Sequence, residues 1–519
     1  MNRKENKYVT KFRQMFMLPA LFNGRHVQPL TIGKFQINAL HVRWHYYALF
    51  GFYALNIIFS FTTMDVFSEN LNSTVSGQWR EYIEIRSGVI ATVLCIPTYL
   101  FGSRNNVLMY LSGWSFETFN VFHRHVGFWM MWQSAIHGIA YTVQYVMNDS
   151  YARVWSQANI VTGTVATLLA GIMVIFAAFP FRHYFYETFL VFHIALAAAF
   201  ARYCWDHVCR FGYEKYMYAM VAVWAFDRFA RLVRIAVHGV YLNAELTVVG
   251  DIMAVNVKPW FDWKPKPGQY AYIYIADPRY KFWESHPFSV MESRDGTYRF
   301  LIAKESGLTK TLFRRAIKNS SGSTTSKVRV MIEGWYGEEP PIARYDTVMI
   351  VGGGIGVTAA ISTALDLVHR ARANQHISFY WVVRGRETLS LVQEQLNELA
   401  RASNIDMHIF VRPGTSNAVN VETGSFSEKT AGASSGEDSD STGSISEKNN
   451  AVANIPIITD VRPDFEQIIP AAIAEAPGSF AAFTCGPGTL VDSCRRAVTA
   501  NADKGRGRVD YFEDAFSWA

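Results

Sequence analysis

The sequence predicts a polytopic α-helical membrane domain followed by a soluble α/β region. Apolar runs of about 20 residues, the length that crosses a bilayer, fill the first half of the 519-residue chain. From about residue 239 onward the apolar runs shorten to roughly four to eight residues, separated by Gly, Pro and charged residues, which is typical of soluble α/β regions. Histidines inside two of the long runs point to metal-bound groups within the membrane part.

Six membrane spans are expected, near residues 45–67, 87–103, 118–146, 160–180, 186–206 and 215–236. Basic residues favour the cytosolic side, and they gather before the first span and at the end of the last: Lys4, Lys7, Lys11, Arg13, Arg25, Arg228, Arg231 and Arg234. Met1 and the soluble half are therefore predicted to be cytosolic. The glycosylation sequons at Asn72 and Asn148 both fall in outer loops. No cleavable signal peptide is evident, because the first apolar run begins far from Met1.

Cysteine spacing and net charge narrow the chemistry further. The five cysteines show no disulfide ladder, zinc spacing or C-x-x-C-H attachment site: Cys95, Cys204, Cys209, Cys485 and Cys494. Any haem is therefore held by ligation and packing alone, which makes it b-type. The net charge of +6 fits contact with the inner leaflet and does not suggest nucleic acid.

Two of the predicted helices each carry a pair of histidines fourteen residues apart, His123 with His137 and His193 with His207. Fourteen helical residues make nearly four turns and rise about 21 Å, so each helix presents one imidazole near each leaflet on roughly one face. Two such helices side by side supply the ligands of two six-coordinate haems. Because both helices run outward, His123 should pair with His193 near the cytosol and His137 with His207 near the outer face.

Other histidines are assigned structural roles. A lone histidine in a membrane helix is more often a packed or hydrogen-bonded core residue than a ligand, and His125 points to the opposite side of the helix from His123. His41 and His45 have the spacing of a helical metal pair, but no carboxylate or cysteine accompanies them, so a helix start beside the membrane is preferred.

Three segments of the soluble half are candidates for holding a flavin. Pro267-Gly268-Gln269-Tyr270 lies between two strand-like runs, and a strand resumes after the second segment, which is His286, Pro287, Phe288 and Ser289. A flavin needs an aromatic or flat apolar wall, hydrogen-bond donors for its ring, and backbone amides for its pyrophosphate. The segment with Gly307 and Thr309 opens a helical pattern and could supply those amides.

A glycine turn between a buried strand and a helix predicts a dinucleotide site. The strand 346–351 leads into Gly352, Gly353, Gly354, Ile355, Gly356, Val357 and Thr358. Val357 departs from the strict glycine pattern, and a purely structural turn is the alternative. The next strand ends at Arg384, where NAD-preferring sites carry a carboxylate. An arginine suits a 2′-phosphate instead, which favours NADPH.

The C-terminal part adds two candidates and a low-complexity insert. Cys485, Gly486 and Pro487 end an apolar run at the sheet edge where a nicotinamide should lie, although a buried cysteine that only packs is as good an interpretation. Trp518 could stack on a flavin and yield to the nicotinamide, or it could be mere packing. Residues 413–452 contain almost no large apolar side chain and are predicted to be disordered.

With four haem-type histidines, HPFS, GGGIGVT, CGP and a terminal aromatic in this order, the chain resembles the fungal ferric reductase transmembrane family. It is similar more widely to NADPH oxidases, which share the core. The phrases FHRHVG, HPFSV and YFEDAFSW carry the likeness to ferric reductases. The resemblance spans about residues 30–519 except the insert.

The resemblance implies a ferredoxin-reductase-like module after the membrane domain, made of an antiparallel β-barrel for FAD and an α/β nucleotide-binding domain. The expected domains are residues 1–44 (cytosolic segment), 45–238 (haem domain), 239–345 (FAD) and 346–519 (NADPH, with the insert 413–452). The implied haem ligands are His123, His137, His193 and His207. The implied FAD contacts are His286 to Ser289, and the implied NADPH contacts are Gly352 to Thr358, Arg384 and Cys485 to Pro487.

The implied activity is electron transfer from cytosolic NADPH through FAD and two b haems to Fe(III) or Cu(II) chelates across the bilayer. Such an enzyme supports metal uptake, alongside an iron-uptake permease and oxidase system, in the plasma membrane or alternatively the vacuolar membrane. No acid/base dyad is needed for an electron relay. A superoxide-producing NADPH oxidase is the rival enzyme, but oxidases that resemble this core have a long outer loop between the fifth and sixth spans. Here about ten residues separate those spans. A non-catalytic membrane scaffold is the third hypothesis.

Two departures from the family pattern stand out. The family often has Glu-Gly-Pro-Tyr-Gly where this chain has Glu333-Gly334-Trp335-Tyr336-Gly337, so the sequence does not determine the backbone turn at this position. Family members also commonly carry an outer domain and a further span before this core, whereas here Met1 opens on the cytosolic segment. A short member or an incomplete gene model is expected on that ground.

Overall fold

The computed structural model describes residues 5–22, 24–32, 35–39, 41–70, 74–276, 284–293, 295–305, 307–319, 325–370, 372, 374–412, 428–429, 455, 457–459 and 461–515. Two compact units divide the chain. The helical unit comprises Pro29–Val233, and the sheet unit combines Met1–Gln28 with Arg234–Trp518. Trp518, Asn72 and the insert 413–452, apart from residues 428–429, lie outside the described residues.

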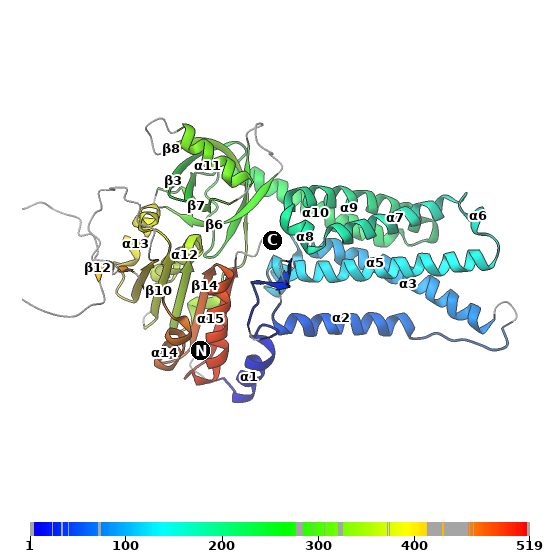
Figure 1. Ribbon diagram of the computed structural model, residues 1–519, viewed down its shortest axis with the longest axis horizontal. Coiled ribbons are helices and arrows are strands. Elements are labelled where there is room, and N and C mark those ends of the chain that lie inside the picture. Colours follow the sequence, from blue (N-terminus) through cyan, green and yellow to red (C-terminus); the bar gives the residue numbers. More distant parts are fainter. Residues whose placement is uncertain are drawn as a thin grey trace, which may run out of the picture. The chain divides into compact units, whose positions relative to one another are not determined.

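Six long helices lie alongside one another in the helical unit (Figure 1), although α10 continues into the sheet unit. They are α2 (Arg43–Phe61), α3 (Val75–Phe101), α5 (Phe116–Met147), α7 (Ala158–Phe176), α9 (Tyr186–Val208) and α10 (Glu214–His238). Each overlaps one expected span. Among the described residues, α3, α7 and α9 are long and apolar enough to cross a membrane. Shorter elements precede or connect them: β1 (Pro29–Ile32) and β2 (Phe35–Ala39) before α2, then α4 (Val107–Ser112), α6 (Tyr151–Val154), α8 (Phe179–Tyr184) and the 3₁₀ turn η2 (Cys209–Phe211).

Helix α3 begins twelve residues before the expected start at residue 87. Its first turns carry alternating charges, including an Arg80–Glu84 ion pair at i,i+4 spacing with 3.8 Å between the charged atoms. Such pairs stabilise a helix without raising its hydropathy, so the apolar run missed these turns. The Thr74 hydroxyl caps the helix by accepting from the Gly77 N–H.

A closed antiparallel barrel forms the first part of the sheet unit after α10. Its strands follow the order β3-β4-β7-β6-β5-β8, and helix α11 (Leu308–Asn319) accompanies them. The strands are β3 (Leu242–Val249), β4 (Ile252–Val257), β5 (Tyr270–Ile275), β6 (Ser285–Glu292), β7 (Tyr298–Ala303) and β8 (Thr325–Tyr336). Alternate β3 residues Leu242, Ala244 and Leu246 are buried, as the period of a strand requires. The expected β-barrel is confirmed.

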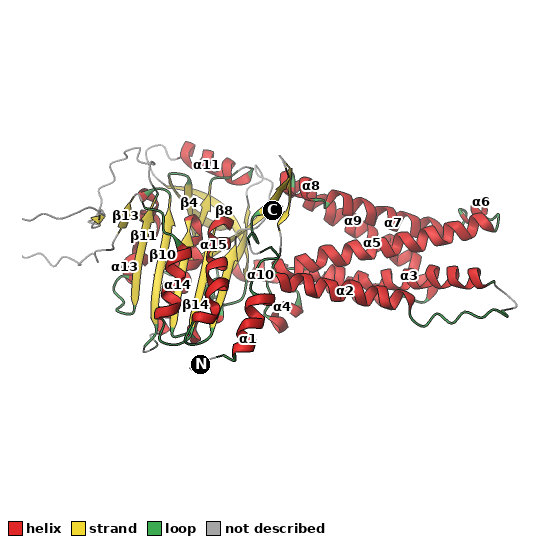
Figure 2. Cartoon of the chain, turned by 60° about the horizontal axis from the view of Figure 1, so that its bottom comes forward, coloured by secondary structure: helices red, strands yellow, loops and turns green. Residues whose placement is uncertain are grey.

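A seven-stranded parallel sheet forms the second part, in the order β12-β13-β11-β10-β9-β14-β15 (Figure 2). The strands are β9 (Thr347–Gly353), β10 (His376–Val383), β11 (Ile405–Val411), β12 (Glu428–Lys429), β13 (Ile457–Thr459), β14 (Phe480–Gly486) and β15 (Val509–Ala515). The helices are α12 (Val357–Arg370), α13 (Gln393–Leu399), α14 (Phe465–Glu475) and α15 (Gly488–Asn501). Strand order reverses between β9 and β14, and doubly wound sheets bind ligands at such a switch point. The expected α/β nucleotide-binding fold is confirmed.

The N-terminal segment docks onto this parallel sheet, which the sequence did not predict. Helix α1 (Lys7–Phe12) continues into the π-helical turn η1 (Arg13–Met17), and the Arg13 guanidinium pairs with Asp510 on β15. The Arg495 guanidinium of α15 donates to the Leu18 carbonyl at 2.7 Å. Because these contacts join residues almost 500 positions apart, no local pattern in the sequence predicts them.

Candidate functional site

The structure brings the two predicted histidine pairs together between α5 and α9. The ring centroids of His123 and His193 lie 6.1 Å apart at an interplanar angle of 74°. Those of His137 and His207 lie 6.0 Å apart at 80°. An iron atom bonded at about 2 Å by one imidazole nitrogen on each side places the ring centroids about 6 Å apart. Both pairs therefore have the spacing that a six-coordinate haem iron requires.

Backbone carbonyls on neighbouring helices orient three of the four imidazoles. The Nδ1–H groups of His123, His137 and His207 donate to three carbonyl oxygens at 2.8, 2.6 and 2.8 Å, which belong to Thr98, Glu84 and Asn159 respectively. A carbonyl only accepts, so the proton sits on Nδ1 and Nε2 keeps a lone pair for a metal. Sequence reasoning missed these partners, because any residue type offers a backbone carbonyl.

His193 differs from the other three histidines. Its Nδ1 is buried and has no hydrogen-bond partner among the described residues. Its ring packs against Phe189 one turn earlier on α9, with 5.3 Å between the centroids. Among the described residues, packing alone positions this imidazole.

The histidines that were assigned structural roles have ordinary partners. His125 Nδ1 lies 2.9 Å from the Tyr53 hydroxyl. His45 is buried against Trp44, with 4.1 Å between the ring centroids. Neither His41 nor His45 joins a described cluster of three metal-binding groups.

Apolar side chains and thiols fill the interior of the helical unit. Met130 sits midway along α5 between its two histidines and Phe200 midway along α9, and both are buried. Cys95 of α3 is also buried, and its Sγ lies 3.6 Å from the Met130 sulfur. An interior of this kind excludes water and gives a low dielectric.

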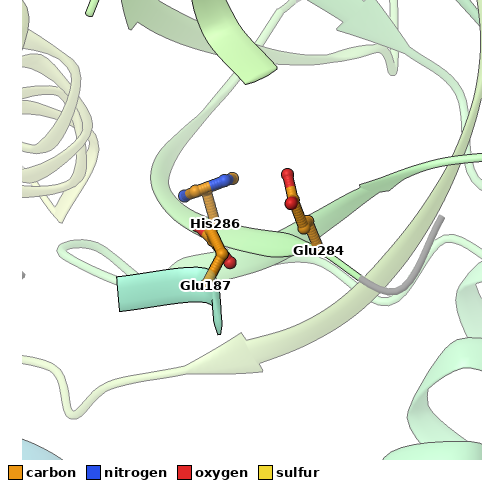
Figure 3. Close-up of side chains that lie close together, drawn as sticks. All are labelled: Glu187, Glu284 and His286. Carbon is orange, nitrogen blue, oxygen red and sulfur yellow. The ribbon is translucent and has the colours of Figure 1, made fainter. Parts of the chain in front are cut away.

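The segment His286 to Ser289 lies on β6, paired with β5 in the register Ile273 with His286 and Tyr270 with Ser289. Figure 3 shows His286 and Glu284 at the beginning of β6; Glu187, also labelled there, belongs to α9 of the helical unit. Burial lowers the pKa of His286, and the Glu284 charge only partly opposes this. The imidazole is therefore neutral at pH 7 and can serve as a hydrogen-bonding group.

Aromatic side chains gather next to this strand, and the sequence reasoning did not single them out. Tyr272 and Tyr336 are buried together, with 5.6 Å between their ring centroids. The buried Glu333 carboxylate accepts from the Tyr336 hydroxyl at 2.8 Å and from Tyr274 at 2.5 Å. The Arg234 guanidinium lies 4.6 Å from the centre of the Tyr336 ring. Flat aromatic faces with ordered polar edges suit a flavin wall.

Gly307 and Thr309 flank the start of α11, as predicted for a site of backbone amides. Gly307 has a φ of 69°, a left-handed conformation that favours glycine. The Thr309 hydroxyl accepts from the Glu305 N–H at 3.2 Å and so closes the turn. The helix therefore begins where an anion could meet its free N–H groups.

Two loops meet at the switch point of the parallel sheet. A Cβ on Gly356 would overlap the carbonyl of Cys485, and a Cβ on Gly353 would lie 2.8 Å from the Pro487 ring. Gly354 is held by the indole of Trp381, whose Nε1–H donates to its carbonyl at 3.1 Å. The structure thus joins the predicted glycine turn and the Cys485 to Pro487 turn through contacts that only glycine allows.

The remaining predicted nucleotide residues take distinct places. Gly352 is the second-last residue of β9, and the buried Thr358 hydroxyl donates to the Ile355 carbonyl at 3.0 Å, inside the turn. Arg384 follows β10 directly and is exposed, so it can reach a ligand at the sheet edge. Burial holds the pKa of the Cys485 thiol well above its usual value, so this cysteine stays protonated and packs.

The N-terminal segment reaches the same edge, which sequence reasoning missed. Val27 would contact a Cβ on Gly488, the residue after Pro487, at 3.0 Å. The buried Asp492 carboxylate accepts from the backbone N–H groups of His26 and Val27 at 2.9 and 3.0 Å. His26 Nε2 lies 3.0 Å from Glu513. Burial raises the pKa of Glu513, but the Arg495 and His26 charges outweigh it and bring the pKa to about 2.

Comparisons with known proteins agree along the whole chain. The family model described as ferric reductase like transmembrane component matches residues 87–204, the FAD-binding domain matches 239–340, and the ferric reductase NAD binding domain matches 345–499. Ferric/cupric reductase transmembrane component 2 of Saccharomyces cerevisiae is 30% identical over 99% of this chain and 72% of its own length. Ferric reductase transmembrane component 3 of the same yeast is 31% identical over 99% and 72%.

Similarity to solved structures is weaker. A ferredoxin NADP+ reductase from Neisseria gonorrhoeae with bound FAD and NADP matches with a TM-score of 0.34 and 10% identity. The match covers 53% of this chain and 99% of that chain.

Proposed function

Because the chain belongs to the family of ferric reductase transmembrane components, we propose that it carries electrons from cytosolic NADPH through FAD and two b-type haems to Fe(III) or Cu(II) chelates across the membrane. It is a membrane oxidoreductase with FAD-binding and NAD-binding domains. The main support for the proposal is that the four imidazoles form two pairs. In each pair the ring centroids lie about 6 Å apart, which is the separation across one iron atom bound by both rings.

The sheet unit is suited to accept the reducing equivalents. The glycine turn at Gly352 to Gly356 opens α12 and offers backbone N–H groups to a pyrophosphate, while Arg384 suits a 2′-phosphate. Met291 of β6 and Ala360 of α12 belong to one continuous core. That core fixes the strand that carries His286 to Ser289 against the nucleotide loops. A bound flavin accepts a two-electron hydride and releases single electrons, which haem iron requires.

The helical unit would hold the haems by ligation alone. His123 and His193 would hold one haem iron through their Nε2 atoms, and His137 and His207 the other. The carbonyls of Thr98, Glu84 and Asn159 keep three of these imidazoles in the tautomer that leaves Nε2 free to bind a metal. The chain has no C-x-x-C-H sequence for covalent attachment, so the haems are b-type. The apolar interior that includes Met130 and Phe200 keeps water away from the two sites.

The short connection between α9 and α10 favours a chelated metal over oxygen as the acceptor. Helix α9 ends at Val208 and α10 begins at Glu214, and the turn η2 occupies most of the link. The rival oxidases, as the resemblance implies, carry a long loop at this position. A link this short leaves access to His137 and His207 for a bulky chelate. In this setting the protein would support metal uptake, next to a permease and oxidase system in the plasma membrane.

The test is to measure Fe(III)-chelate and Cu(II)-chelate reduction beside superoxide release in membranes that contain the protein, with NADPH as donor. We expect chelate reduction that superoxide dismutase does not inhibit. Superoxide release without chelate reduction would overturn the choice of acceptor. Absence of any b-type signal in a reduced-minus-oxidised spectrum would overturn the haem relay itself.

A further inference from the structure

Three of the four imidazoles lie against a glycine on the neighbouring helix. An ideal Cβ on Gly88 would come within 2.6 Å of His137 Nδ1, and one on Gly163 within 2.7 Å of the His207 ring. A Cβ on Gly102 would lie 3.0 Å from His123 Nδ1. Contacts below 3.0 Å require something to move, so these positions leave little or no room for a side chain.

Each glycine stands four residues after the carbonyl that its histidine uses. Glu84 precedes Gly88, Thr98 precedes Gly102, and Asn159 precedes Gly163 by this same interval. A helical side chain points back toward the N-terminus and covers the turn before it. At these three positions glycine leaves that turn uncovered, and the carbonyl can use its second lone pair to accept from an imidazole.

We propose that Gly88, Gly102 and Gly163 are positioning residues that orient the haem-ligating histidines by exposing one backbone carbonyl each. This inference rests on the proposed function, because it assigns the histidines as haem ligands. The glycines touch neither haem iron nor an electron acceptor. They act by fixing the tautomer and the ring plane of a ligand, as a hydrogen-bonding partner beyond the ligand shell does.

The fourth histidine, His193, supports the proposal because it lacks both the glycine and the hydrogen-bond partner among the described residues. On α3, the second glycine and its carbonyl residue follow the first glycine and its carbonyl residue by fourteen positions. On α7, fourteen positions after Asn159 and Gly163 come Met173 and Ala177. Ala177 ends α7 as Gly102 ends α3, and its N–H donates to the Met173 carbonyl at 2.9 Å. An alanine therefore stands where the pattern calls for glycine. His193, which this position would serve, is the histidine whose Nδ1 lacks a partner among the described residues.

The test replaces the glycines singly with alanine in the full-length protein and measures haem content, redox titration steps and CO binding to the reduced protein. G88A and G163A should each displace a ligand of the same haem. We expect haem absorbance per protein to fall by up to one half, one redox step to move or vanish, and CO to bind the haem that loses a ligand. G102A should cause a smaller change of the same kind in the other haem, because its contact is looser.

Two other glycines of the long helices in the helical unit serve as controls. Among the described residues, nothing lies within 4 Å of a Cβ added to Gly138 on α5 or to Gly171 on α7, so G138A and G171A should leave both haems unchanged. Retention of the second haem in G88A and G163A shows that the helical unit still folds. Unchanged spectra, potentials and CO binding in both variants would overturn the inference while leaving the proposed function intact. A wild-type protein without b-type haem would overturn the proposed function and this inference with it.

The reverse substitution, Ala177→Gly, probes the exception. Uncovering the Met173 carbonyl should let His193 donate to it, which raises the basicity of the imidazole and stabilises ferric iron. We expect the midpoint potential of one haem to fall while the other stays fixed. An unchanged pair of potentials would show that Ala177 does not govern His193 and would break the equivalence between α3 and α7.

Discussion

The helical unit is expected to bind its cofactors through side chains, whereas the sheet unit is expected to bind its cofactors mainly through backbone groups. In the helical unit four imidazoles at fixed helical intervals define two places, each with a ring separation of about 6 Å. In the sheet unit the turns at Gly353 and Pro487 define a place because two loops meet closely. A site of side chains is lost when one residue changes, while a site of backbone groups is lost when two loops are forced apart. Both units use glycine for the same physical purpose, close approach.

The largest effect is expected from removing one imidazole of the helical unit. His207→Ala should eliminate one haem and lower NADPH-driven chelate reduction at least about 100-fold, because the electron-transfer path loses one of its two haems. NADPH oxidation with a soluble dye should continue, since the sheet unit is untouched. The measurement is haem content together with both activities. His125→Ala, which removes the partner of Tyr53, is the control and should keep both haems. Full chelate reduction in the His207 variant would remove His207 from the relay.

A backbone site should respond to a single methyl group. Gly356→Ala would push the glycine turn away from the Cys485 carbonyl. We expect kcat/KM for NADPH to fall about 100-fold, the cost of misplacing a reacting group by roughly 1 Å. The haem spectrum should stay normal, because the helical unit does not depend on this loop.

Steady-state kinetics with NADPH and a soluble dye measure this change. Gly24→Ala is the matched control in the same unit, because the nearest described atom to an added Cβ there is the Phe22 carbonyl oxygen at 3.8 Å. Normal kinetics in the Gly356 variant would show that the two loops do not form the nucleotide site.

Within the sheet unit, the Arg384 side chain is expected to contribute to NADPH binding. Arg384→Gln should raise KM for NADPH about 10- to 100-fold, the value of a charge-assisted hydrogen bond to phosphate, and should change KM for NADH little. Arg401→Gln, at another position on the same domain, is the control. An equal loss with both nucleotides would assign Arg384 to general binding and not to the 2′-phosphate.

The smallest effect is a pH dependence at the end of β15. Burial, with help from the Glu513 charge, raises the pKa of Asp514 to about 7. The folded chain therefore keeps a proton that the unfolded chain releases above about pH 4, so the free energy of unfolding falls as pH rises through this window. Asp514→Asn cannot ionise and should lose this slope.

Thermal unfolding followed by flavin fluorescence measures this contribution. The gain in Tm of the variant over wild type should grow from nothing at pH 4 to several degrees at pH 8. Glu338→Gln, at an exposed carboxylate, should leave the wild-type profile unchanged. A Tm difference that is constant across pH would exclude ionisation of Asp514 as its cause.

Much of the fold and the pairing of the four histidines could be predicted from the sequence, because they follow from local patterns. Apolar runs gave the helices, and the interval of fourteen residues gave the histidine pairs. The early start of α3 was missed because Arg80 and Glu84 stabilise the helix through charge, which a hydropathy pattern does not register.

The parts that could not be predicted depend on neighbours far away in the chain. The carbonyls of Glu84, Thr98 and Asn159 have no side-chain signature, and their glycines resemble any small residue of a membrane helix. The contact of Val27 with Gly488 joins two ends of the chain that no periodicity links. The spacing of Gly88 and Gly102, equal to that of the histidines, was the one available signal.

The central claim is that NADPH electrons cross the helical unit through two histidine-ligated haems. Its most direct test is anaerobic addition of NADPH to the purified FAD-loaded protein, with the b-type spectrum and haem-to-protein ratio recorded before any acceptor is present. The account predicts two haems per chain, both reduced by NADPH and both reoxidised when an Fe(III) chelate is added. One haem or none per chain, or haem that dithionite reduces and NADPH does not, would contradict it.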